Sequence, residues 1–381
     1  MTIKKHNLFV LLCIVAFCNS LFSQSPFSYI TKNDSLTNDS SSYFLHTDIT
    51  QFLKNNEYFS PIVEGYTLFG TNLKAGGYIQ PSSKAKVYLG FNAIKYYGDS
   101  SQMTIKPECY IQYHFNKYNS VLMGSLYNRP EIKLLPMLTD HETMFTETSK
   151  EGLAFNINTN RLHWDIWVAW LNYLHARQHA QEKIFLGIIL DYDIIKSDKT
   201  ELTIPFQFTV LHMGGQINDI QTPLHMMINN AIGLTYKYKV SSSKSITARY
   251  SYVGYADKSS YIDYAYQVGN GDGHFAELSF KTKHFQTAFS YWKGNQFYSP
   301  LGEAYYSSIS SRIPLNNPTT NQPKREFITT HFYYNTELTK GLTLLCGTQL
   351  FYDTRNAICD YSYSFILRFT FDKKIKSNSQ M

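Results

Sequence analysis

The last regular segment of the chain, residues 361–371, constrains the fold more than any other stretch. Its odd positions carry only Tyr, Phe and Leu, whereas its even positions carry Ser, Ile, Arg and Thr. A period of two indicates a β-strand whose two faces meet different surroundings. The aromatic face is too apolar for water, and Arg368 on the other face cannot be buried without polar partners. A strand of about ten residues between lipid and a polar lumen satisfies both conditions.

Similar alternation recurs from Glu64 onward, in segments separated by turn residues. The predicted strands are 64–71, 73–80, 86–96, 104–115, 119–128, 151–158, 162–174, 182–194, 200–212, 227–239, 245–256, 273–281, 285–296, 326–338, 342–353 and 360–371. Their connections alternate between short, such as 116–118, and long, such as 129–150. Tight periplasmic turns and larger outer loops give this alternation in membrane barrels. The sequence therefore predicts an all-β fold, a transmembrane antiparallel β-barrel of about 16 strands, with 14 or 18 also compatible.

The segment 361–371 resembles the closing strand of Gram-negative outer-membrane β-barrels. The whole chain resembles a porin-like barrel of the Tyr- and Asn-rich style common in Bacteroidota, and its 31 Tyr and 26 Phe suit interfacial aromatic girdles. The resemblance implies an outer-membrane location, contact with outer-membrane lipid and insertion by the barrel-assembly machinery. Closing strands usually end the chain on an aromatic residue, whereas here Phe371 is followed by residues 372–381. The resemblance defines no functional subfamily.

The N-terminus has the pattern of a secretory signal peptide. Lys4 and Lys5 form a basic region, residues 8–17 are apolar, and Ser23 offers a small residue for cleavage. The predicted organisation is a signal peptide at 1–23, a periplasmic N-terminal segment at 24–63, the barrel at 64–371 and a polar periplasmic tail at 372–381.

Charged side chains on the predicted strands face the lumen, because a charge on the lipid face costs about 2–4 kcal/mol at mid-bilayer. The predicted lumen-lining residues are Lys106, Glu108, Asp165, Lys183, Glu201, Lys237, Arg249, Glu277, His331, Glu337 and Arg368. One hypothesis is a channel or porin in which opposed charges orient small hydrophilic solutes. The alternative is an ion-paired network that fills a closed lumen. A closed barrel would suit a scaffold or accessory of a secretion, gliding or surface-glycan system. A lipid or fatty-acid transporter is a third hypothesis, and it requires an apolar lumen.

Aromatic residues in the long outer loops suggest a second kind of contact. The candidates for binding sugar rings, such as those of surface glycans, are Tyr261, Tyr264, Tyr298, Tyr305 and Tyr306. Carboxylates accompany them, and stacking combined with hydrogen bonding suits a sugar. The alternative is that these tyrosines belong to the outer girdle or pack the loops on each other.

The sequence gives no sign of catalysis or of a cofactor. A barrel hydrolase needs a nucleophile beside a His and its orienting partner, and the His-x-Ser-Asn-Gly type signature of outer-membrane phospholipases is missing. Cys109, Cys346 and Cys359 form neither a zinc motif nor a disulfide framework. Asp140, His141 and Glu142 diverge on an extended segment, so no metal site is predicted. The net charge of +6 includes no long basic block, so no nucleic-acid partner is predicted. The chain is expected not to be an enzyme.

Overall fold

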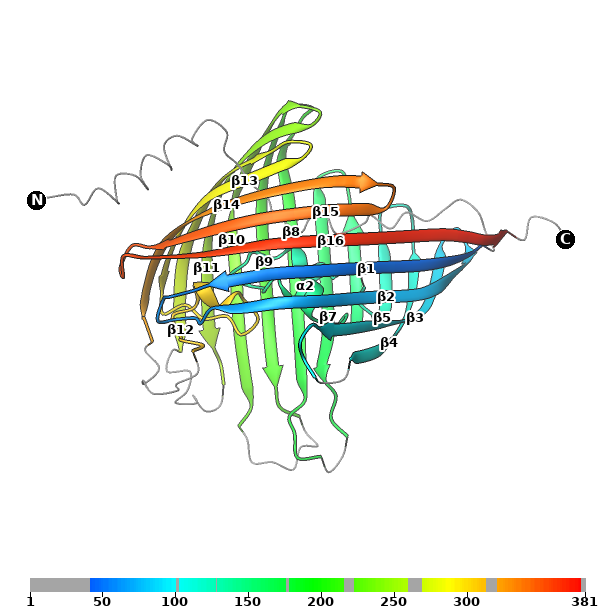
Figure 1. The fold of residues 1–381 in the computed structure, drawn as a ribbon, viewed down its shortest axis with the longest axis horizontal. Coiled ribbons are helices and arrows are strands. Elements are labelled where there is room, and N and C mark those ends of the chain that lie inside the picture. The colour runs from blue at the N-terminus through cyan, green and yellow to red at the C-terminus, as the bar shows by residue number, and fades with distance from the viewer. Residues whose placement is uncertain are drawn as a thin grey trace, which may run out of the picture.

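The computed structural model describes residues 42–100, 103–127, 129–175, 178–215, 223–259, 269–312 and 321–377. They form a closed barrel of sixteen antiparallel strands, in which each strand pairs with its neighbours in sequence and β1 pairs with β16 (Figure 1). The strands are β1 Ser42–Glu57, β2 Tyr66–Ser82, β3 Ala85–Tyr96, β4 Thr104–His114, β5 Ser120–Ser125, β6 Glu151–Asn158, β7 Leu162–Asn172, β8 Lys183–Lys196, β9 Thr200–Met213, β10 His225–Ser241, β11 Lys244–Asp257, β12 Asn270–Lys281, β13 Phe285–Asn295, β14 Lys324–Thr339, β15 Leu342–Asp353 and β16 Ile358–Ser377.

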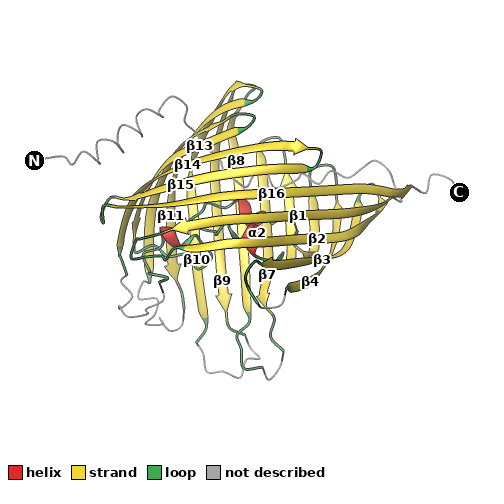
Figure 2. Cartoon of the chain, viewed as in Figure 1, coloured by secondary structure: helices red, strands yellow, loops and turns green. Residues whose placement is uncertain are grey.

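The predicted fold class and strand number are confirmed. The described helices are only η2 Pro130–Lys133, α2 Thr143–Thr146 and η4 Ala304–Tyr306, drawn in red in Figure 2. Within the described ranges, no helix is long and apolar enough to cross a membrane.

The start of the barrel differs from the prediction. β1 lies inside the segment 24–63 that was predicted to be periplasmic, and β2 is one strand where two were predicted. β1 carries polar residues on both faces, so its sequence lacks a clear alternation of apolar and polar positions. Lys54 faces inward, and outward-facing Gln51 accepts a hydrogen bond from Thr71 Oγ1 at 2.8 Å. Asn72, which interrupts the predicted strands, is buried inside the barrel and donates to the carbonyl of Phe145 at 3.2 Å.

The end of the barrel also extends beyond the prediction. β16 continues to Ser377, so most of the predicted polar tail is strand. The extension is stabilised by pairing with β1, in which Asp372 lies opposite His46 and their side chains meet at 2.7 Å. Residues 1–41, including the predicted signal peptide, and residues 378–381 lie outside the described part of the chain.

The outer face of the wall is apolar where a membrane would surround it. Phe365 and Phe369 on β16 are 48% and 37% exposed, and Leu278, Phe289 and Phe332 continue the band on β12, β13 and β14. A soluble protein rarely exposes a contiguous apolar surface of this extent, whereas a lipid-facing barrel requires it. The long connections lie at one end, which we therefore call the extracellular end.

Candidate functional site

Two extracellular connections fold into the lumen. Residues 126–127 and 129–150 lie in the connection from β5 to β6, and residues 296–312 begin the connection from β13 to β14. Together these described residues are called the plug. The segments are joined by backbone hydrogen bonds from Asp140 N to Leu301 O at 2.6 Å and from Glu303 N to Pro136 O at 2.8 Å. The plug thus behaves as one packed unit rather than as two free loops.

The plug packs against apolar side chains that point inward near the extracellular ends of the strands. Met137 and Leu138 are fully buried in a cluster with the wall residues Trp167, Trp292 and Phe327. Interiors of this kind pack to crystalline density. The plug and these wall residues therefore fill much of the extracellular half of the lumen, beside a cavity of about 440 Å³ that Thr, Ser, Lys and Glu side chains help to line.

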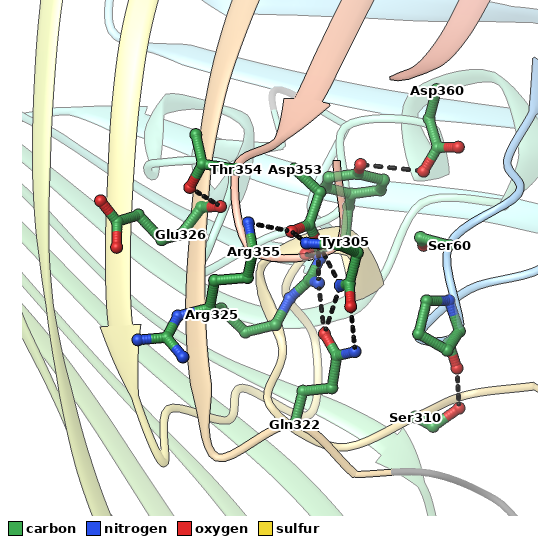
Figure 3. A network of polar contacts seen from close by, with 12 residues as sticks. Ser60, Tyr305, Ser310, Gln322, Arg325, Glu326, Asp353, Thr354, Arg355 and Asp360 are labelled. Carbon is green, nitrogen blue, oxygen red and sulfur yellow. Dashed lines mark hydrogen bonds and ion pairs between the residues drawn. The ribbon is translucent and has the colours of Figure 1, made fainter. Parts of the chain in front are cut away.

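A buried ion pair between β14 and β15 holds one segment of the plug against the wall through Tyr305 (Figure 3). The Arg325 and Asp353 side chains are 0% and 1% exposed, and Arg325 Nη1 lies 2.6 Å from Asp353 Oδ2. Arg325 Nη2 also donates to the carbonyl of Tyr305 at 3.0 Å, and the Tyr305 hydroxyl donates to Asp360 Oδ2 at 2.9 Å. This network fixes the 296–312 segment against β14, β15 and β16.

We expect Asp353→Ala to lower the free energy of unfolding by about 3–5 kcal/mol, because it leaves the Arg325 charge buried without its partner. Urea unfolding in detergent micelles measures the change. Asp372→Ala is the control: it breaks the His46–Asp372 contact, whose side chains are 27% and 26% exposed, and should cost less than about 1 kcal/mol. Equal effects of the two substitutions would contradict the role given to Arg325.

A second anchor, called the Glu142 latch, consists of Glu142 in the plug and Lys54, Asn56 and Tyr66 in the wall. Lys54 Nζ lies 2.5 Å from Glu142 Oε1, Asn56 Nδ2 donates to the same oxygen at 3.0 Å, and the Tyr66 hydroxyl donates to Oε2 at 2.7 Å. Burial opposes ionisation of Glu142, but the Lys54 ammonium and these hydrogen bonds hold its pKa below the usual value. Both carboxylate oxygens are thus committed to the wall.

Asp140 and His141 lie beside the latch. Asp140 Oδ1 accepts from Glu142 N at 2.9 Å, and His141 Nδ1 lies 3.2 Å from Glu303 Oε1. Burial, with the nearby charges of Glu142 and Glu303, raises the pKa of Asp140 to about 7. His141 is only 4% exposed, so it is buried between the plug and the wall. Among the described residues, no group of three or more acidic, His or Cys side chains could hold a metal ion.

The raised pKa of Asp140 gives a pH dependence. The pKa of Asp140 is 3.8 in the unfolded chain and about 7 in the folded protein. Between pH 3.8 and about 7 the folded protein therefore binds more protons than the unfolded chain. The free energy of unfolding falls as pH rises through that range. The pKa of Glu142 is lowered by Lys54 and its hydrogen bonds, so Glu142 is not the source of this fall in stability. We expect the free energy of unfolding to fall by on the order of 4 kcal/mol at most across this pH range. Asp140→Asn should flatten the unfolding free energy between pH 5 and 7, and an unchanged slope in this variant would exclude Asp140 as the source.

Below the plug the lumen is polar. A cavity of about 190 Å³ lies there, roofed by Lys133 and Leu135 of the plug, whose backbone is held by Gln207. Its wall includes charged residues from four strands, β8 to β11, listed here: Asp191, Glu201, Lys237 and Arg249. The lumen therefore holds the plug, with its apolar cluster and buried ion pairs, toward the extracellular end and a charged cavity below it toward the periplasm.

The structure places the predicted lumen residues in varied surroundings. Lys237 and Glu201 pair at 3.2 Å, Asp165 pairs with Lys133 at 2.6 Å, Arg368 pairs with Asp48, and Glu108 lies 3.8 Å from Lys74. Arg249 lines the cavity, and Glu277 lies opposite it on β12. His331 lies 3.2 Å from Thr329 Oγ1, and Lys106 lines a second cavity, of about 440 Å³, beside the plug. Lys183 is at the extracellular end of β8, and Glu337 accepts from Gly341 N at a periplasmic turn.

The predicted loop tyrosines are mostly part of the plug. Tyr305 and Tyr306 are 3% and 1% exposed and pack with Phe327, while Tyr298 meets Tyr255 edge-on. Their rings pack the plug instead of forming an open face for sugar, which corrects the prediction for Tyr305 and Tyr306. Tyr261 and Tyr264 lie outside the described residues.

The outer wall carries a polar group that the sequence analysis missed. His274 on β12 is exposed, and its Nδ1 lies 2.7 Å from the hydroxyl of Tyr250 on β11. Lys293 on β13 is the cross-strand neighbour of His274, and Glu326 on β14 is the neighbour of Lys293. The Tyr291 hydroxyl donates to Glu326 Oε1 at 2.7 Å. We call Tyr250, His274, Tyr291, Lys293 and Glu326 the His274 patch.

The His274 patch faces outward because its residues alternate with buried ones. Phe275 and Trp292, the chain neighbours of His274 and Lys293, are 2% and 1% exposed and point into the barrel. Four residues farther toward the periplasm on the same two strands, the outward residues are Leu278 and Phe289. The patch therefore lies above the apolar band, at the level where lipid headgroups meet acyl chains.

The architecture resembles that of known outer-membrane proteins at very low sequence identity. An OmpT loop-deletion variant, an outer-membrane protein of Vibrio cholerae, aligns with a TM-score of 0.52 and 7% identity over 87% of this chain and 100% of that one. Pseudomonas aeruginosa OprD aligns with a TM-score of 0.51 and 10% identity over 92% and 99% of the two chains. OccK5 of the same organism aligns with a TM-score of 0.50 and 11% identity over 89% of this chain and 100% of that one. These similarities establish the fold alone.

The sequence comparisons give the family. No curated protein matches the chain. A family model described as "Lipid A 3'-O-deacylase-type" matches residues 35–378, which span the whole barrel. That family is one of enzymes, so the prediction that the chain is not an enzyme was wrong; the missing phospholipase signature excluded one catalytic arrangement and not others. The chain belongs to the lipid A 3'-O-deacylase-type family.

Proposed function

We propose that the protein is an outer-membrane hydrolase that removes an ester-linked acyl chain from a lipid A-type glycolipid of the outer leaflet. The family match over residues 35–378 is the observation that carries the proposal. The filled extracellular half of the lumen supports placing the reaction on the outer wall, because a lipid with several acyl chains cannot enter a packed apolar core.

The His274 patch supplies groups suited to ester hydrolysis at that position. In the tautomer in which Nδ1–H donates to the Tyr250 oxygen, Nε2 of His274 keeps its lone pair and serves as a general base. Lys293 places an ammonium group beside it, where negative charge on a carbonyl oxygen or a headgroup phosphate would be stabilised. Tyr250 acts as a positioning residue through its contact with the ring.

The reaction we propose uses water as the nucleophile. His274 Nε2 removes a proton from a water molecule as the water oxygen bonds to the ester carbonyl carbon. The charge that develops on the carbonyl oxygen lies near the Lys293 ammonium. When the bond from that carbon to the sugar oxygen breaks, the proton passes from His274 to the sugar oxygen. The products are a fatty acid and a free sugar hydroxyl.

Mass spectrometry of lipid A incubated with the purified protein in detergent micelles tests the activity. We expect a product that is lighter by one acyl chain, together with the matching free fatty acid. Lipid A recovered unchanged from correctly folded protein, shown by different gel mobility with and without boiling, would overturn the proposal.

A channel for small hydrophilic solutes is the second candidate, and the charged cavity below the plug is the observation that favours it. Conduction along this path requires the plug to leave its place, because the plug and the wall share the apolar core above the cavity. This candidate therefore depends on the strength of the Glu142 latch.

A further inference from the structure

The cavity below the plug contains two opposite charges that make few direct contacts with other side chains. Arg249 makes one hydrogen bond within the described ranges, from Nε to Thr235 Oγ1 at 3.4 Å, so its two terminal nitrogens have no partner there. The Asp191 carboxylate has no hydrogen bond or ion pair to any residue that the structure describes. Both side chains line the same cavity.

The other charges around the cavity are paired. Lys133 Nζ lies 2.6 Å from Asp165 Oδ2, and Glu201 accepts from Lys237 at 3.2 Å and from Lys239 at 2.6 Å. Glu277 lies opposite Arg249 on β12 but outside the cavity lining, so Arg249 and Asp191 are the charges of the described lining that have no direct ion pair. An unpaired charge in a partly enclosed site is costly, and a ligand of opposite charge offsets that cost.

Strand register places the two free charges close to each other. Asp191 lies opposite Pro205 on β9, and Arg249 lies opposite Thr235, which in turn lies opposite Thr203. Thr203 and Pro205 are successive inward positions of one strand, so the charges are one inward row apart along the strand direction. β8 and β11 are three strand spacings apart, roughly 14 Å along the curved wall. Both side chains are on inward faces of the wall and line the same cavity.

We propose that this cavity binds a small zwitterion of amino-acid size, with its carboxylate on Arg249 and its ammonium group on Asp191. The volume, about 190 Å³, is somewhat larger than the roughly 150 Å³ of an apolar cavity that holds benzene. A planar guanidinium suits a carboxylate because it can donate two parallel hydrogen bonds. The site is inside the barrel and does not rest on the proposed hydrolysis at the outer wall.

The ligand reaches the cavity from the periplasmic side. Glu201 is the second residue of β9, and Lys237 lies near the end of β10, so the lining extends to the periplasmic rim. The roof is Lys133 and Leu135 of the plug. The barrel is thus built as a receptor open to the periplasm and closed toward the outside.

Calorimetric titration of the purified protein in detergent tests the inference with three matched probes. L-alanine carries both charged groups, propionate lacks the ammonium group, and isopropylammonium lacks the carboxylate. We expect saturable binding of alanine, with each singly charged analogue at least tenfold weaker. No saturable binding of alanine, or equal binding of either analogue, would overturn the proposal.

Two isosteric variants test the residues. Arg249→Gln and Asp191→Asn should each weaken alanine binding at least tenfold, whereas Glu337→Gln, at a periplasmic turn outside the cavity, should bind as the unmodified protein does. Gel mobility with and without boiling checks that each barrel is folded. Alanine binding of unchanged strength in folded Arg249→Gln and Asp191→Asn would overturn the assignment, and the three probes still test the site if a variant does not fold.

Discussion

Replacing His274 with Ala is expected to lower the rate of lipid A deacylation by at least about a hundredfold. A positioned general base typically contributes 10²–10⁴-fold to a rate, and His274 is the group in the His274 patch whose ring nitrogen can accept a proton from water. The measurement is the initial rate of fatty-acid release from lipid A in detergent micelles. Lys293→Gln should also slow the reaction, because it removes the ammonium group beside the developing charge.

His212→Ala is the matched control for this substitution. His212 is near the extracellular end of β9, paired with Ile184 on β8 and Met226 on β10, and it has no place in the His274 patch. We expect its rate to equal that of the unmodified protein. If His274→Ala deacylates lipid A normally, the reaction takes place elsewhere on the barrel; if the unmodified protein is inactive, the proposed function itself fails. The two failures are therefore distinguishable.

Most of the wall could be predicted because one physical rule governs it. In β15 and β6 the predicted bounds coincide with the observed ones, and in the strands between β3 and β16 the differences are a few residues at the ends. An apolar outward face is obligatory in lipid, and it recurs at every second residue. β1 was not predicted because it carries polar residues on both faces, which removes the alternation of apolar and polar positions. These residues find hydrogen-bond partners on other strands, as Gln51 does with Thr71 of β2, and the sequence does not show those contacts.

The plug and the His274 patch depend on contacts between distant residues. The run Leu134-Leu135-Pro136-Met137-Leu138 was the available signal for the plug, since an exposed loop rarely carries so apolar a stretch. No comparable feature of the sequence indicates the His274 patch. Tyr250, His274 and Lys293 come from three strands, and only the register of β11, β12 and β13 brings them together. Outward-facing ionisable residues also contradict the assumption that all charges on the strands face the lumen.

The second large effect is expected from Glu142→Ala, which removes the plug side of the Glu142 latch. The substitution leaves Lys54 buried without its carboxylate, and breaking such a pair costs about 3–5 kcal/mol. Asn56 and Tyr66 lose their acceptor at the same time. We expect the plug to leave the wall for part of the time, so that planar bilayers show intermittent conductance steps with the variant and none with the unmodified protein.

The double variant Lys54→Met with Glu142→Leu separates loss of the latch charge from loss of plug packing. Replacing a buried ion pair by apolar side chains of similar size is often neutral or stabilising, so the double variant should show far fewer steps than Glu142→Ala. Any steps that remain reflect Asn56 and Tyr66, which still lack their acceptor. Steps in Glu142→Ala that disappear in the double variant would establish that the unpaired Lys54 charge drives the plug out. A folded Glu142→Ala barrel that stays silent would instead mean that the apolar contacts of Met137 and Leu138 alone keep the lumen closed. In that case the plug does not open, and the proposed channel has no conducting state. Hydrolysis at the outer wall is then the function that the packed lumen still permits.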